Sequence, residues 1–146
     1  MKKWISMSLL TIIFLTGCQE EAVEDTLIPI EVTITTQETL NVHEEIKLQA
    51  HVTKNGKDIN DADEVKFEVW ESGMREEAEM VSAVLTKNGI YEATYQFDHD
   101  GVYYVFAHTT ARDMHVMPKK KFIVGTPDMT KVLEDNTSNS MDHNNH

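Results

Sequence analysis

The sequence predicts an all-β protein, an immunoglobulin-like antiparallel β-sandwich of about seven strands. Apolar residues alternate with polar ones at a period of two in several short segments, and few segments show the 3.6-residue period of a helix. Turn dipeptides such as Asn55-Gly56 and Asn88-Gly89 separate the segments. With 146 residues, 40% of them hydrophobic, the chain is long enough for one domain with a core. We therefore expect a single sandwich domain over residues 28–125.

Each of the seven expected strands has one face that can be buried. Ile30, Val32 and Ile34 define the first strand, and the alternation from Ile46 to Val52 defines the second. The other strands are expected at residues 64–71, 79–86, 90–97, 102–109 and 114–124. Turn residues at 98–101 separate the fifth strand from the sixth.

Two aromatic residues are expected in the core of this sandwich, Trp70 in the third strand and Tyr103 in the sixth. Immunoglobulin-like domains place a corner tyrosine at the position of Tyr103, with its hydroxyl bonded to nearby backbone. Because side chains alternate, an inward Tyr103 turns Tyr104 and Phe106 outward. We expect this apolar outer face to be covered by the tail or a partner, or to form the floor of a site.

Residues 1–17 have the architecture of a signal peptide: two lysines at the start, then an apolar stretch to Leu15. The stretch is too short to span a membrane as a helix. It ends in Leu-Thr-Gly before Cys18, which resembles a bacterial lipobox and implies cleavage before a lipidated Cys18. The alternative is an ordinary secretory signal with a chance cysteine. We expect an anchor in membrane lipid on the extracytoplasmic face of the cell membrane, followed by an acidic spacer over residues 18–27.

Several classes of function are disfavoured by composition. A formal charge of −12 argues against a nucleic-acid partner. Cys18 is the only cysteine, so its lipidation leaves no thiol for a disulfide, a thiolate metal site or a nucleophile, and no hydrolase or phosphate-binding motif is present. We expect no enzymatic activity. Residues 126–146 are rich in Asn, Ser, Thr and Asp and are expected to form a disordered tail.

Soft metal donors gather where the sixth and seventh strands meet. These candidate ligands are His108, Met114, His115 and Met117. Thioether and imidazole groups together favour Cu(I) over magnesium or calcium. The alternative is that the methionines fill gaps in the core and the histidines are solvated. His143 and His146 in the tail are given no role in the site.

The segments Gly89-Ile90-Tyr91, Gly101-Val102-Tyr103 and Val124-Gly125, with Phe97, His108 and Met114-His115, resemble the YtkA-like or FixH-like domain of bacterial lipoproteins. The resemblance spans about Ile28 to Gly125. It implies a setting of copper delivery to respiratory oxidases, with oxidase-assembly or copper-transport proteins as partners. FixH itself keeps a membrane-spanning segment, whereas this chain is expected to use a lipid. The alternative function is a metal-free interaction module whose Tyr104 and Phe106 face docks a membrane protein.

Overall fold

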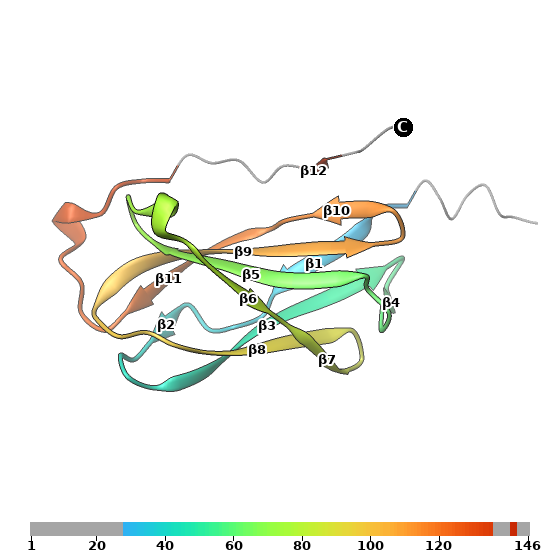
Figure 1. Ribbon diagram of the computed structural model, residues 1–146, viewed down its shortest axis with the longest axis horizontal. Coiled ribbons are helices and arrows are strands. Elements are labelled where there is room, and N and C mark those ends of the chain that lie inside the picture. Colours follow the sequence, from blue (N-terminus) through green and yellow to red (C-terminus); the bar gives the residue numbers. More distant parts are fainter. Residues whose placement is uncertain (1–27, 136–140, 143–146) are drawn as a thin grey trace, which may run out of the picture.

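The computed structural model describes residues 28–135 and 141–142, and two β-sheets packed face to face form the body of the molecule (Figure 1). The expected signal peptide, Cys18 and the spacer lie outside the described residues. Within the described part of the chain, no helix is long and apolar enough to cross a membrane. The fold is all-β, as the alternating pattern predicts.

The first sheet has the strand order β1-β3-β8-β7, and all of its pairings are antiparallel. Its strands are β1 (Ile30–Ile34), β3 (Glu45–Lys54), β7 (Val84–Lys87) and β8 (Ile90–Gln96), and the short β4 (Lys57–Asp58) also pairs with β3. Asn55-Gly56 and Asn88-Gly89 form the predicted turns, with positive φ at all four residues. Asn and Gly adopt this conformation at little cost, which is why these dipeptides close hairpins.

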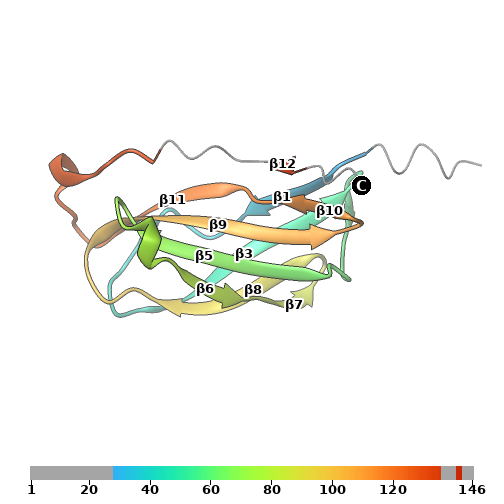
Figure 2. The same cartoon turned by 45° about the horizontal axis from the view of Figure 1, so that its top comes forward.

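The second sheet is built around β9 (Gly101–Ala111), the longest strand (Figure 2). It pairs on one side with β5 (Glu64–Glu71), and on the other with β10 (Met114–Val116) and β11 (Lys119–Val124). The outer strands are β6 (Glu79–Ser82) beside β5, β2 (Thr39–Leu40) parallel to β11, and β12 (Met141–Asp142) beside β10. The first sheet thus matches strands A, B, E and D of an immunoglobulin-like sandwich, and β5, β9 and β11 match strands C, F and G.

Two of the expected strands are each divided into two. The segment expected at 79–86 forms β6 in the second sheet and β7 in the first, with Ala83 between them, so the chain changes sheets there. The segment expected at 114–124 is interrupted at Met117 and Pro118. Proline has no N–H to donate to a sheet, although the Pro118 carbonyl still accepts a hydrogen bond of 3.0 Å from the Ala107 N–H.

The main core lies between the two sheets and contains inward residues of both, among them Leu48, Val52, Phe67, Phe97 and Val105. Tyr103 belongs to it, and its hydroxyl donates to the His99 carbonyl at 3.2 Å. The predicted tyrosine corner is therefore present.

Trp70 is buried, with 3% of its surface exposed, but its predicted place in the main core is wrong. It packs with Val102, Tyr104 and Phe106 on the opposite face of the second sheet, in what we call the outer cluster. The reason is alternation: Val69 occupies the main core, so the next side chain along β5 faces outward.

Residues 126–135, which we call the strap, run along the outer face of the second sheet. They include η2 (Met129–Lys131), and Val132 packs against the outer cluster. The Ser72 hydroxyl donates to the Leu133 carbonyl at 2.6 Å and accepts from the Leu133 N–H at 2.9 Å. The expectation of disorder from residue 126 onward is therefore wrong for the strap, because its backbone is paired and its valine is packed. The rest of the predicted tail, apart from β12, lies outside the described residues.

Candidate functional site

His108 and His115 lie close together on the outer face of the second sheet. His108 alternates with the inward Ala107 along β9, and His115 in β10 is paired with Thr110. The centroids of the two imidazole rings are 5.6 Å apart. Only 19% of the His108 side chain is exposed. The structure thus brings together two of the predicted donors from neighbouring strands.

Each of these imidazoles has one nitrogen in a hydrogen bond to a neighbouring side chain. His108 Nε2 lies 2.7 Å from Glu68 Oε2, and His115 Nδ1 lies 3.1 Å from Thr110 Oγ1. No other described residue makes a hydrogen bond to His108 Nδ1 or His115 Nε2. A neutral imidazole binds a metal through its unprotonated nitrogen while the other nitrogen is held by a neighbour. His108 has this arrangement, and His115 has it in the tautomer whose Nδ1–H donates to the Thr110 hydroxyl.

The two predicted methionine ligands lie on different faces of the sheet. Met114 packs against the main core, whereas Met117 packs against the outer cluster. Val116 pairs with Thr109, and the carbonyl of Pro118 accepts a hydrogen bond from Ala107. Met117 lies between Val116 and Pro118, so it is across from His108. The outer face therefore holds His108, His115 and Met117, and Met114 is not brought to them.

Glu68, in β5, is a member of the site that the sequence did not reveal. Its side chain is 13% exposed and is held by Arg75, whose Nε lies 3.0 Å from Oε1. The Arg75 guanidinium in turn lies 4.9 Å from the ring centroids of both Trp70 and Phe106. Burial alone raises the pKa of Glu68, but hydrogen bonds from Arg75 and His108 outweigh it and hold the pKa below its ordinary value. Glu68 is therefore an ionised acceptor at neutral pH.

Carboxylate and imidazole groups alone do not form a metal site in the described part of the chain. No three His, Cys, Asp or Glu side chains gather there as a metal-binding group. A three-donor set on the outer face consequently needs the Met117 sulfur together with the two imidazoles. This mixture of soft and borderline donors suits Cu(I), whereas Mg²⁺ and Ca²⁺ prefer oxygen ligands.

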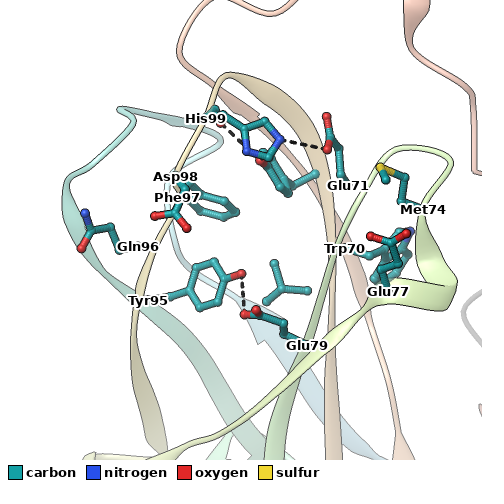
Figure 3. A pocket seen from close by; sticks show the side chains of 12 residues that line it. Trp70, Glu71, Met74, Glu77, Glu79, Tyr95, Gln96, Phe97, Asp98 and His99 are labelled. Carbon is teal, nitrogen blue, oxygen red and sulfur yellow. Dashed lines mark hydrogen bonds and ion pairs between the residues drawn. The ribbon is translucent and has the colours of Figure 1, made fainter.

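A separate pocket of about 260 Å³ opens near His99, where the ends of β5, β6 and β8 meet (Figure 3). His99 Nε2 lies 3.0 Å from Glu71 and 3.2 Å from the Tyr103 hydroxyl. The Tyr95 hydroxyl donates to Glu79 at 3.0 Å. Burial, together with the negative charges of Glu71 and two nearby aspartates, raises the pKa of Tyr103 to about 12. These groups bond to one another across the pocket, so we assign the contacts a structural role in joining the strand ends.

Comparison with known protein families gives a match to the model described as YtkA-like, over residues 24–108. The chain belongs to the YtkA-like family. The matched residues include Glu68 and end at His108, so His115 and Met117 lie beyond the matched region.

No curated protein has a sequence that matches this chain. Among solved structures, Salmonella alpha-2-macroglobulin reacted with methylamine is 19% identical over 68% of this chain, with a TM-score of 0.51. The aligned region spans only 6% of the macroglobulin. The superoxide reductase (neelaredoxin) of Ignicoccus hospitalis is 12% identical over 72% of this chain and 88% of its own length, with a TM-score of 0.45. At such identities the macroglobulin likeness shows a shared fold and nothing of function.

Proposed function

We propose that this YtkA-like protein is a lipid-anchored, extracytoplasmic copper-binding lipoprotein. It holds Cu(I) through His108, His115 and Met117 and passes the ion to proteins of copper transport or respiratory-oxidase assembly. The observation that carries the proposal is the pair of imidazole rings 5.6 Å apart, each with one nitrogen held by a neighbour and the other left for a metal.

The chemistry of the donors supports copper as the cargo. Thioether sulfur is a weak ligand for hard cations and a good one for Cu(I), and imidazole binds copper well. The site lies near one edge of the sheet, because β10, which contains His115, pairs only with β9 and the two-residue β12 among the described strands. A position near a sheet edge gives an acceptor protein access, which a carrier that releases its ion requires.

The expected location comes from the N-terminal segment. Cleavage and lipidation at Cys18 would place the domain at the outer surface of the cell membrane, where copper-dependent oxidases are assembled. A partner in that process is expected to be a membrane or membrane-attached protein. This part of the proposal rests on the lipobox-like sequence before Cys18 and on the resemblance of the domain.

The face on which the alternative, a metal-free docking module, depends is covered in the structure. Tyr104 and Phe106, the residues expected to meet a partner, are both buried. Trp70, Val132 and Met117 surround them, and Lys119 Nζ lies 5.5 Å from the Tyr104 ring centroid. A partner could contact that face only after the strap had left it, so we favour copper binding.

Titration of Cu(I) against a competing chelator tests the proposal. The full chain in detergent would carry Cys18→Ser in every sample, so that no thiolate binds the metal. Met117→Leu and Met114→Leu form a matched pair: the same thioether is removed from opposite faces of one segment. We expect Met117→Leu and His108→Ala to weaken binding by at least about tenfold, the effect of losing roughly 1.4 kcal/mol.

Met114→Leu is expected to leave the copper affinity unchanged, because leucine replaces methionine well in a packed core. Equal copper affinity in all of these variants would show that the outer face does not bind the ion. A loss with Met114→Leu alone would place the site elsewhere.

A further inference from the structure

We propose that Glu68 is the positioning residue of the copper site: it fixes the His108 ring so that Nδ1, and not Nε2, faces the metal. The inference deepens the proposed function and rests on it. Glu68 is contributed by β5, the strand on the far side of β9 from His115 and Met117, so it approaches His108 from the side opposite those two donors.

The contact with His108 determines which ring nitrogen is protonated. An ionised carboxylate only accepts hydrogen bonds, so at 2.7 Å from Glu68 Oε2 the His108 Nε2 must carry the proton. In the neutral ring the lone pair is then on Nδ1. A carboxylate that holds the non-ligating nitrogen of a metal-binding histidine fixes both the protonation and the orientation of the ring, and makes the ligand more basic.

Glu68 is itself held in place. Arg75 donates from Nε to Oε1 at 3.0 Å and from Nη2 to Oε2 at 3.4 Å, and its guanidinium lies against the Trp70 and Phe106 rings. The carboxylate therefore sits between a cation packed on the outer cluster and the imidazole. A ring held in this way loses less rotational freedom when a metal binds, which favours affinity.

A second glutamate on the same strand provides a natural comparison. Glu71 lies 3.0 Å from His99 Nε2, but the His99 side chain is 63% exposed and belongs to the pocket of Figure 3 rather than to the outer face. The two pairs have the same chemistry, but only the Glu68 pair lies on the outer face with His115 and Met117. The Glu71 pair shares its pocket with Met74 and, among the described residues, no second histidine. Glu71→Leu is thus a matched control for Glu68→Leu.

The first measurement is copper affinity of the full chain in detergent, by competition with a Cu(I) chelator. Glu68→Leu is expected to weaken binding about 10- to 100-fold, the usual effect of removing a carboxylate partner of a metal-bound histidine. Glu68→Gln keeps an oxygen acceptor and should lose less. Glu71→Leu should bind as tightly as the parent. An unchanged affinity in a folded Glu68→Leu variant would overturn the inference while leaving the copper site in place.

The second measurement needs no substitution and therefore does not depend on how Glu68→Leu folds. In ¹⁵N-labelled protein, the hydrogen bond should make the His108 Nε2–H proton visible by slowing its exchange. Addition of Cu(I) should shift the Nδ1 resonance and retain the Nε2–H signal. Loss of that signal, with copper on Nε2, would refute the role of Glu68. If the parent binds no copper at all, the proposed function itself fails, which is a different result.

Discussion

Replacement of Trp70 by alanine tests the account of the outer face most directly. The indole is 3% exposed, and its ring centroid lies 5.2 Å from that of Phe106 and 5.8 Å from that of Tyr104. Alanine would leave a void between the second sheet and the strap. It would also remove one of the two rings against which the Arg75 guanidinium lies, the other being Phe106.

The expected loss of unfolding free energy is about 3–5 kcal/mol, the usual range for a buried Trp→Ala change. A buried aromatic side chain removes roughly 150–250 Å² from water, which is worth about 4–6 kcal/mol at 25 cal/mol per Å². Part of this is recovered if neighbours move into the void. The strap can do so, because it is a single segment outside the sheet; beside Trp70 its Leu133 is tied to Ser72, the residue after β5, by two hydrogen bonds.

Urea unfolding followed by far-UV circular dichroism provides the measurement, since that signal comes mainly from the backbone rather than from the removed indole. Met80→Ala is the control, because Met80 also lies in the second sheet but is 55% exposed, and its loss should cost no more than about 0.5 kcal/mol. If Trp70→Ala is as mild as Met80→Ala, then Trp70 is not buried beneath the strap, and our description of the outer cluster is wrong.

Two further predictions concern other parts of the chain. Cys18→Ala should abolish lipidation and membrane retention, as seen by labelling with a fatty-acid analogue and by cell fractionation; normal processing and attachment would contradict the lipobox interpretation. Tyr103 has a pKa of about 12 in the folded protein against about 10 when unfolded, so only the unfolded state loses the proton between these values. The contribution of Tyr103 to stability is complete below about pH 10 and is lost as pH rises towards 12. Thermal stability should therefore fall more steeply over this range in the parent than in Tyr103→Phe. Equal slopes in the two proteins would exclude the raised pKa.

Local patterns predict much of the fold. The period-two alternation gives β1, β3, β5, β8 and β9 close to their observed bounds, because each of these strands has one face in the main core. The Asn-Gly dipeptides predict the turns correctly because Asn and Gly adopt positive φ at low cost, which depends only on the local sequence. The corner tyrosine is also local, since Tyr103 bonds to a carbonyl only four residues earlier.

Features that depend on distant segments could not be obtained in the same way. The outward direction of Trp70 follows from alternation with Val69, but a large aromatic residue is outward and buried only where a further layer covers it. That layer is the strap, which is polar in composition and lacks a periodic apolar face. Its order comes from contacts with β5 and β9, and the Ser72 and Leu133 that tie it down are 61 residues apart in the sequence.

The candidate site shows the same division between local and distant information. In a regular strand, residues an odd number of positions apart lie on opposite faces, so Met114 and Met117 are separated while His115 and Met117 share a side. The number of soft donors within this short segment of the sequence is therefore larger than the number that can lie together on one face of the sheet. What replaces Met114 in the site is Glu68, 40 residues from His108 and visible only once β5 is paired with β9. A carboxylate at this position adds no soft donor. The proposed copper site therefore keeps two imidazoles and one thioether, and the charge of Glu68 would act on it through the His108 ring.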